Sequence, residues 1–214
     1  TVKLLEACKD NCGRFVFVSS SSVYGDAQLL PTPESSSPNP TSPYALQKLV
    51  GEKYCEMFSD LYGMDTAIVR PFNIYGERQL PDGAYGTALS SWLYACKRGT
   101  EIRFDGDGMQ SRDMVHVSDV VQVLDLVASH GTKMTGYVFN AGTGIPTRNK
   151  DILDRILKRA PHCKNSIRQA PTRQGDVRET LADIYSARKI GYTPKVQFDR
   201  GFSMTYDWVM SEKY

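Results

Sequence analysis

Residues 15–25 read FVFVSSSSVYG, a run of apolar β-formers that leads directly into four serines. Because Phe15 to Val18 show no alternation of apolar and polar side chains, the run predicts a strand buried on both faces of a parallel sheet. Ligands of open α/β sheets bind at the carboxyl ends of strands, so the serine hydroxyls could orient a substrate oxygen there. A solvated serine turn explains the same four residues equally well.

The segment SPYALQK, residues 42–48, predicts the start of a helix. Ser42 is a good N-cap, and Pro43 suits the first helical position. Tyr44 and Lys48 would then lie one turn apart on one helix face. A cationic Lys48 near the Tyr44 hydroxyl favours the phenolate form, which can exchange a proton with an alcohol or sugar hydroxyl. The spacing alone is weak evidence, because many surface helices carry it by chance.

The chain then alternates between predicted helices and strands. Apolar side chains at helical spacing predict that the helix from Pro43 packs into a core until Gly63 ends it: Leu46, Leu49, Val50, Tyr54, Met57, Phe58 and Leu61. Further strands are predicted over residues 66–69, 102–104, 115–117 and 137–140, and further helices over 89–98, over 184–190 and after a cap at Ser118 or Asp119.

Composition excludes several classes of protein. A net charge of +2 gives no electrostatic case for nucleic acid. No apolar run approaches the ~18 residues of a membrane span. The five cysteines are odd in number and scattered, so they predict reduced thiols in a cytoplasmic protein and no metal site.

Three motifs in order resemble the extended short-chain dehydrogenase/reductase family, and more narrowly its NAD-dependent nucleotide-sugar 4-epimerases: SSSSVYG at 19–25, SPYALQK at 42–48 and RPFNIYG at 70–76. The segments GDGMQSRD (106–113), RQGD (173–176) and GYTPK (191–195) extend the resemblance. It implies an α/β fold with a doubly wound Rossmann-type parallel sheet and a smaller C-terminal α/β substrate domain. Residues 1–76 would be the C-terminal part of the NAD-binding domain, and 77–214 mainly the substrate domain, with residues 113–130 returning to the first.

One family feature is missing from this sequence. The family opens with a glycine-rich turn that holds the NAD pyrophosphate, and Gly106-x-Gly108 does not open a helix as that turn does. By comparison with a doubly wound fold, roughly 100 residues, about three βα units, would precede Thr1. We therefore expect a fragment whose sheet is incomplete at its N-terminal side, and a lone chain that binds NAD poorly and is inactive.

The resemblance also assigns residues to roles. Tyr44 would be the acid and base, Lys48 would hold it deprotonated, and Ser20, four residues before Tyr24, would bond the C4 oxygen. The implied NAD contacts are Ser19, Ser20, Tyr44, Lys48 and Phe72. The implied UDP-sugar contacts are Ser20, Ser21, Ser22, Tyr44, Asn73, Gln79, Arg112, Arg173, Asp176 and Thr180. Core packing remains an alternative for Phe72, as do surface salt bridges for Arg112, Arg173 and Asp176. Arg70 is expected to form a structural ion pair at the strand end.

The small side chain of Thr180 stands where some relatives carry a bulky aromatic, so it leaves room for an N-acetyl group at C2. The expected reaction is interconversion of UDP-GlcNAc and UDP-GalNAc through a 4-keto intermediate, with UDP-glucose and UDP-galactose as a further pair. The resemblance also implies a homodimer built partly from the Tyr44 helix. A dehydratase or decarboxylase of the same family would need an acidic residue where Ser20, Ser21 and Ser22 stand, and a non-catalytic nucleotide-sugar-binding domain is the remaining alternative.

Overall fold

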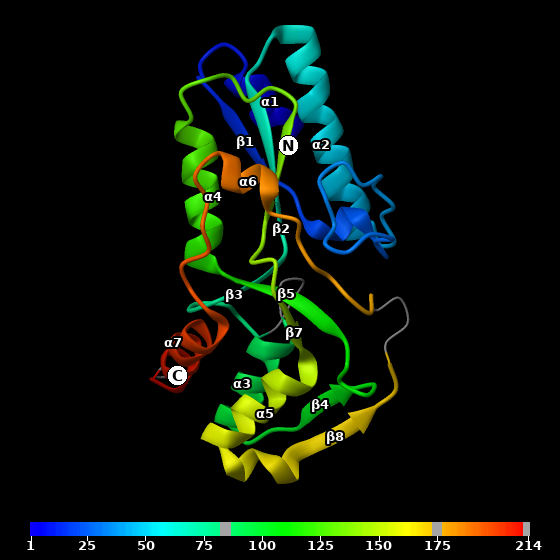
Figure 1. The fold of residues 1–214 in the computed structure, drawn as a ribbon, viewed down its shortest axis with the longest axis vertical. Helices are drawn as coiled ribbons and strands as arrows, with labels where there is room; N and C mark the ends of the chain where they lie inside the picture. The colour runs from blue at the N-terminus through cyan, green and yellow to red at the C-terminus, as the bar shows by residue number, and fades with distance from the viewer. Residues whose placement is uncertain (82–86, 173–176, 212–214) are drawn as a thin grey trace.

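A three-stranded parallel sheet forms one half of the molecule. The computed structural model describes residues 1–81, 87–172 and 177–211. The strand order is β1-β2-β6, comprising β1 (Phe15–Val18), β2 (Thr66–Pro71) and β6 (Tyr137–Ala141). Helices α1 (Val2–Cys8) and α2 (Pro43–Tyr62) pack on one face, and α4 (Val117–Ser129) and α6 (Tyr185–Lys189) pack on the other (Figure 1). This arrangement confirms the predicted α/β fold with a Rossmann-type parallel sheet.

The other half holds two smaller sheets around a second core (Figure 1). Strand β5 (Ser111–His116) lies between β3 (Asn73–Tyr75), to which it is parallel, and β7 (Pro146–Arg148), to which it is antiparallel. Strand β4 (Ile102–Asp105) pairs in parallel with β8 (Ile167–Ala170). The elements packed around these strands are α3 (Ala88–Arg98), α5 (Asn149–Arg159), the 3-10 turn η2 (Pro161–Ser166) and α7 (Phe198–Ser211).

The chain crosses between the two halves more often than the sequence indicated. We expected residues 113–130 to return to the first half, and α4 does pack on its sheet. Two further elements also return to the first half: β6, which pairs with β2, and α6, whose Ala187 is buried in the same core. The boundaries of the two domains stay a prediction.

Helix α2 begins and ends as predicted, but its buried face differs from the prediction. The Ser42 side chain accepts a hydrogen bond from the Ala45 N–H at 3.1 Å, and Gly63 ends the helix in the left-handed conformation. The predicted apolar stripe is a core face only in part. Leu49 and Phe58 pack against the core. Leu46, Met57 and Leu61 are instead 52%, 53% and 67% exposed. Small residues face the sheet instead, because the helix approaches β1 closely: Ala45, Gly51, Cys55 and Ser59.

Strand β1 is less buried than its apolar sequence predicted. Its residues 15–17 are half-buried and Val18 is 40% exposed, whereas β2 is buried along its whole length. The reason is position, because β1 is the edge of the sheet and β2 is its centre. Buried central strands and edge strands can share one sequence pattern.

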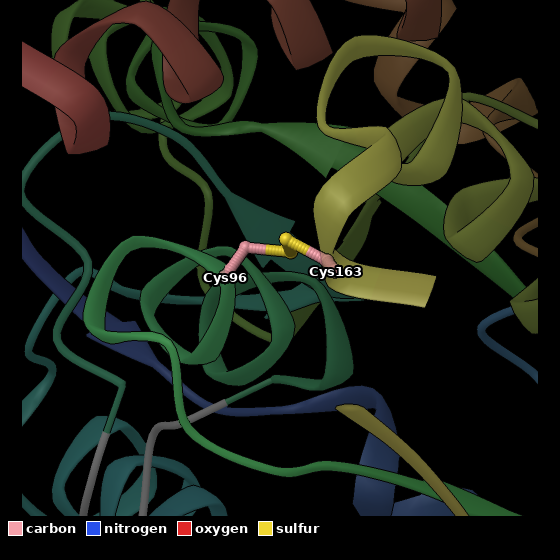
Figure 2. Close-up of a disulfide and its surroundings, with 2 residues drawn as sticks. All are labelled: Cys96 and Cys163. Atoms are coloured by element: carbon pink, nitrogen blue, oxygen red, sulfur yellow. A yellow bond between two sulfur atoms is a disulfide. The ribbon is translucent and has the colours of Figure 1, made fainter. Parts of the chain in front are cut away.

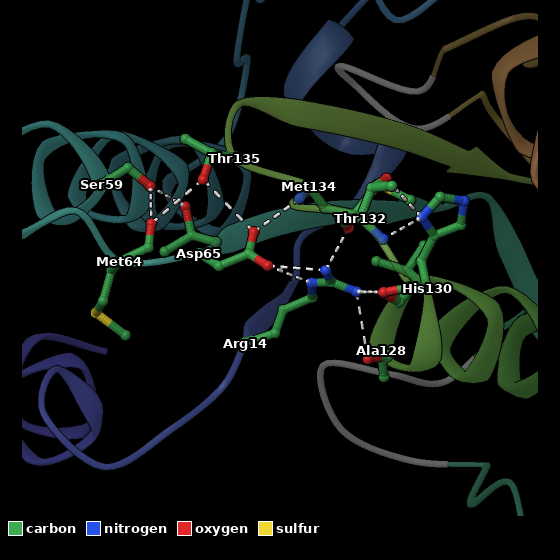
Figure 3. Close-up of polar contacts among 11 residues, drawn as sticks. Arg14, Ser59, Met64, Asp65, Ala128, His130, Thr132, Met134 and Thr135 are labelled. Atoms are coloured by element: carbon green, nitrogen blue, oxygen red, sulfur yellow. Dashed lines mark hydrogen bonds and ion pairs between the residues drawn. The ribbon is translucent and has the colours of Figure 1, made fainter.

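Arg14 ties the amino end of the first sheet to α4 (Figure 3). Its guanidinium pairs with Asp65 at 2.8 Å and donates to the carbonyls of Val127 at 2.6 Å and His130 at 3.0 Å. A cation at a helix C-terminus is favourable, because the last carbonyls of the helix are otherwise unsatisfied. Asp65 in turn accepts from the Met134 N–H at 2.8 Å. The end of the sheet opposite the strand-end serines is thereby fixed.

The structure joins Cys96 of α3 and Cys163 of η2 in a disulfide (Figure 2). The prediction that all five cysteines are reduced is therefore wrong. The two residues lie 67 positions apart in the sequence, and tertiary packing brings their Cα atoms to 5.5 Å. The cytoplasmic location, which was inferred from those thiols, stays a prediction. Within the described ranges, no helix is both long and apolar enough to cross a membrane.

Candidate active site

The carboxyl end of the first sheet opens into a cavity of about 430 Å³, which we call the strand-end cavity. The loops after β1 and β2 and the start of α2 form its walls. The lining residues are Val18, Ser19, Ser20, Tyr44, Lys48, Pro71, Phe72, Asn73, Ile74, Gln79 and Thr87. Seven of the thirteen site residues predicted from the sequence thus meet in one place, although they come from three separate segments.

A second cavity of about 350 Å³, the distal cavity, adjoins the first and contains another predicted residue, Arg112. Asn73 and Thr87 line both cavities and so form the boundary between them. Thr180 belongs to the same boundary, because its hydroxyl donates to the Asn73 side-chain oxygen at 3.2 Å. The two cavities can therefore hold the two ends of one elongated ligand.

Helix α2 places Tyr44 and Lys48 side by side on the cavity wall. The Lys48 ammonium lies 5.7 Å from the centre of the Tyr44 ring and 5.6 Å from the centre of the Phe17 ring. It donates to the Val18 carbonyl at 2.9 Å, which anchors it to the last residue of β1. Partial burial lowers the pKa of the Lys48 ammonium below its ordinary value. Tyr44 is 37% exposed, so a ligand in the cavity can reach it.

The serine loop is more ordered than a solvated turn. Ser20 caps the 3-10 turn η1 (Ser21–Tyr24), and its hydroxyl oxygen accepts from the Ser22 N–H at 3.2 Å and the Ser22 hydroxyl at 2.9 Å. Ser19 is buried and donates to Glu52. Ser19 and Ser20 line the cavity, whereas Ser21 and Ser22 are not among its lining residues.

A buried ion pair supports the floor of the cavity. Glu52 of α2 accepts two hydrogen bonds from Arg70 of β2, at 2.9 and 2.6 Å. Burial disfavours the charged guanidinium, but its hydrogen bonds to Glu52 prevail and raise the pKa of Arg70. The structural role predicted for Arg70 is confirmed. Glu52 was missed, although it stands four residues after Lys48, as Lys48 stands after Tyr44.

The ion pair continues into a polar network behind the serine loop. The Arg70 guanidinium lies 4.8 Å from the centre of the Tyr24 ring, and the Tyr24 hydroxyl donates to Asn140 at 2.8 Å. Burial raises the pKa of Tyr24 to about 12. The network therefore connects the carboxyl ends of β1, β2 and β6 beneath the cavity.

Asp113 joins the two halves of the molecule next to Arg112. This fully buried carboxylate accepts hydrogen bonds from the N–H groups of Thr143, Gly144 and Ala182 at 2.8, 2.8 and 3.1 Å. Burial raises the pKa of Asp113, against the opposing effect of those hydrogen bonds. Arg112 donates to the Ser111 carbonyl at 2.9 Å, and its side chain reaches the distal cavity.

Two predicted substrate contacts, Arg173 and Asp176, lie outside the described residues. In the part of the chain that is described, no cluster of three or more His, Cys, Asp or Glu side chains could hold a metal ion. The described part of the site therefore comprises the strand-end cavity and the distal cavity.

Comparison with known proteins gives a consistent result. The sequence model of the NAD dependent epimerase/dehydratase family matches residues 1–142. A relative from Methanocaldococcus jannaschii, described as a putative UDP-glucose 4-epimerase, is 35% identical over 98% of this chain and 67% of its own length. Relatives described as dTDP-glucose 4,6-dehydratases also match, at 28% to 30% identity.

Solved structures extend this result. The UDP-glucose 4-epimerase of Thermotoga maritima with UDP-glucose superposes with a TM-score of 0.89 at 33% identity, covering 97% of this chain and 67% of that one. The UDP-N-acetylglucosamine 4-epimerase of Methanobrevibacter ruminantium, in complex with UDP-N-acetylmuramic acid, has a TM-score of 0.88 at 31% identity, covering 98% and 67%. The chain spans about two thirds of the length of these proteins.

Proposed function

Because the chain belongs to the NAD-dependent epimerase/dehydratase family, we propose that it provides the catalytic and substrate-binding part of a UDP-sugar 4-epimerase. One observation carries the proposal. Ser20, Tyr44 and Lys48 share the strand-end cavity, which adjoins a distal cavity that contains Arg112. A proton-transfer group and a cation for a diphosphate are thereby available to a single ligand.

In the proposed reaction, the Tyr44 oxygen takes the proton of the sugar C4 hydroxyl and later returns it to the same oxygen. Lys48 stabilises the anionic form of Tyr44, because an ammonium close to the ring favours negative charge there. Ser20 donates a hydrogen bond to the C4 oxygen and so holds it within reach of Tyr44. NAD, held at its nicotinamide end by the residues of the strand-end cavity, would supply the acceptor and donor of the C4 hydride, so that epimerisation passes through a 4-keto sugar.

The residues of the strand-end cavity fit one end of NAD. Phe72 offers an apolar surface to the nicotinamide, and Lys48, Ser19 and Tyr44 offer polar groups to its ribose. The glycine-rich turn that holds the pyrophosphate is not found in this sequence. We therefore propose that the 214-residue chain by itself binds NAD poorly and is inactive, and that activity requires that turn.

For the substrate, we propose that the hexose occupies the strand-end cavity and the UDP end occupies the distal cavity. Arg112 would bind the diphosphate, with Arg173 and Asp176 as further contacts to the nucleotide. Asn73 and Gln79 would contact the sugar or diphosphate near the boundary. Ser21 and Ser22 line neither cavity, so we retain only Ser20 as a sugar contact from the serine loop.

We propose UDP-GlcNAc and UDP-GalNAc as the preferred pair, and UDP-glucose and UDP-galactose as the second. Thr180 supports this choice, because its side chain is small and its hydroxyl donates to Asn73, a residue that lines both cavities. Thr180→Tyr should lower kcat/KM for UDP-GlcNAc at least tenfold more than for UDP-glucose, since the ring would fill the space for the N-acetyl group. Equal losses for both substrates would contradict the role of Thr180.

A dehydratase is the second candidate, because relatives of that description match the chain. Elimination requires a group that protonates the leaving hydroxyl. No carboxylate is found among the described residues that line the strand-end cavity, and serines occupy the loop where such an acid would stand. This lining favours epimerisation over dehydration or decarboxylation.

The test is an assay of the protein with its pyrophosphate-binding part present, supplied with NAD and each UDP-sugar. NMR of the sugar would identify the product. We expect C4 epimers from the unmodified protein and at least a hundredfold loss of kcat in Tyr44→Phe or Lys48→Met. Tyr62→Phe and Lys53→Met, at exposed positions of the same helix, are matched controls that should keep normal activity.

Each alternative gives a distinct result in this assay. Loss of one water from the sugar would identify a dehydratase, and loss of carbon dioxide a decarboxylase. Calorimetric binding of UDP-GlcNAc without any product would identify a non-catalytic binding domain. Any of these three results would overturn the epimerase proposal.

We also propose that the protein forms a homodimer through α2. Five side chains of the predicted apolar stripe lie on the surface of this helix: Leu46, Val50, Tyr54, Met57 and Leu61. An exposed apolar stripe of this kind is typical of a helix that packs against a partner. Sedimentation velocity should give a dimer, and Met57→Glu should convert it to a monomer.

A further inference from the structure

His116 connects the start of α4 to Glu77. This buried residue caps α4, and its Nδ1 lies 3.3 Å from the backbone nitrogen and 2.8 Å from the hydroxyl oxygen of Ser118. The other ring nitrogen, Nε2, lies 3.1 Å from the Glu77 carboxylate, within hydrogen-bond distance. Glu77 is therefore held at the N-terminus of α4 through the imidazole.

Glu77 lies in a sharp bend that follows β3. Gly76 has φ of +152°, and a Cβ at that position would lie 2.7 Å from Val117, so the chain approaches α4 closely there. Arg78 has φ of +67° and is the one non-glycine residue with positive φ in the described part of the chain. Such a conformation is strained and persists only when its surroundings hold it. The Tyr75 and His116 rings meet at 80° with their centres 5.4 Å apart, and this packing restrains the imidazole plane.

The bend returns the chain to the boundary between the two cavities. The Gln79 side chain donates to the Ile74 carbonyl at 3.1 Å and accepts from the Thr87 hydroxyl at 3.3 Å. Gln79 lines the strand-end cavity, and Thr87 lines both cavities and caps α3. The position of this wall therefore depends on the bend at Arg78.

We propose that Glu77 is a positioning residue for the UDP-sugar site. Its hydrogen bond with His116 Nε2 holds Arg78 in the strained conformation, and that conformation places Gln79 and Thr87 against the ligand. Neither Glu77 nor His116 lines the strand-end or the distal cavity, so both act through the loop. The inference rests on the proposed function, because it assigns the ligand to the UDP-sugar class.

The experiment measures binding of UDP-GlcNAc and UDP by calorimetry to the protein with its pyrophosphate-binding part present. Glu77→Ala should weaken UDP-GlcNAc binding about tenfold, because Arg78 relaxes and the wall withdraws. Glu77→Gln should stay within twofold of the unmodified protein, since its amide oxygen accepts the same Nε2–H. The double variant Glu77→Ala, Arg78→Gly should recover most of the loss, because glycine adopts the bend without strain. Glu56→Ala, which removes an exposed ion-paired carboxylate on α2, is the matched control.

Several results would overturn the inference. Glu77→Ala could bind as tightly as Glu56→Ala, Glu77→Gln could bind as weakly as Glu77→Ala, or Arg78→Gly could fail to restore binding. A measurement without mutation covers the case in which Glu77→Ala does not fold. Nitrogen NMR of His116 should show a proton on Nε2, which Glu77 accepts, and an Nε2 without a proton would refute the hydrogen bond. If the unmodified protein binds neither ligand, the proposed function fails instead, and the NMR result still decides the His116–Glu77 interaction.

Discussion

Replacement of Glu52 by alanine should remove a large part of the stability of the fold. Glu52 and Arg70 have side chains only 1% and 5% exposed, and Ser19 also donates to the same carboxylate. Glu52→Ala leaves the Arg70 guanidinium buried without a counter-ion. Removing one partner of a buried pair costs about 3–5 kcal/mol, because the remaining charge is neither solvated nor neutralised.

Urea unfolding followed by circular dichroism measures this loss. With an m-value at the upper end of about 1–3 kcal/mol/M, the midpoint should fall by roughly 1–2 M. Replacing both charges, in Glu52→Leu with Arg70→Met, should cost less than Glu52→Ala alone, because no unpaired charge remains.

The matched control is Glu56→Ala on the same helix. Glu56 is 43% exposed and pairs with Lys53 at 2.8 Å, so its loss should cost no more than about 1 kcal/mol. A Glu52→Ala midpoint equal to that of Glu56→Ala would refute the argument. So would a double variant that is less stable than Glu52→Ala.

Three further predictions follow from packing, titration and cysteine chemistry. Gly51→Ala should lower the free energy of unfolding by about 1–2 kcal/mol despite the better helix propensity of alanine, because a Cβ there overlaps the Phe17 ring; a gain in the urea midpoint would contradict this. The pKa of Tyr24 is about 12 in the folded protein, against an ordinary value of 10.0. The contribution of Tyr24 to stability is therefore complete below pH 10 and is lost as the pH rises through 12. Tyr24→Phe should reduce the fall of the urea midpoint between pH 10 and 12. Thiol titration of the unfolded, unreduced protein should count three free cysteines, because Cys96 and Cys163 are paired, and a count of five would show that the disulfide is absent.

Local sequence signals predicted the helices and strands. Features that depend on tertiary contacts could not be predicted from the sequence. Ser42 and Gly63 delimit α2 as expected, because a cap and a left-handed glycine act within one turn of the helix. The α4 cap was assigned to Ser118 or Asp119 but belongs to His116, since Asp119 instead accepts from the N–H groups of Lys195 and Val196. That partner segment is distant in sequence and leaves no local signal.

The candidate site shows the same division. The serine loop and the Tyr44 helix could be placed at one cavity, because parallel strands bring their carboxyl ends to one edge of a sheet. The pairing of Glu52 with Arg70 depends on a register between α2 and β2 that no spacing rule gives. The exposure of Leu46 and Leu61 likewise depends on how closely α2 approaches β1, which is set by the absence of a side chain at Gly51.

The buried Asp113 carboxylate has a consequence for the choice of ligand. Its hydrogen bonds connect β5 to the turn before β7 and to Ala182. The two halves therefore cannot rotate apart without leaving a buried carboxylate that lacks its hydrogen-bond donors. The separation of the strand-end and distal cavities is then constant. Under the proposed function, a substrate must therefore be long enough to occupy both cavities, as a sugar joined to a nucleoside diphosphate is expected to be.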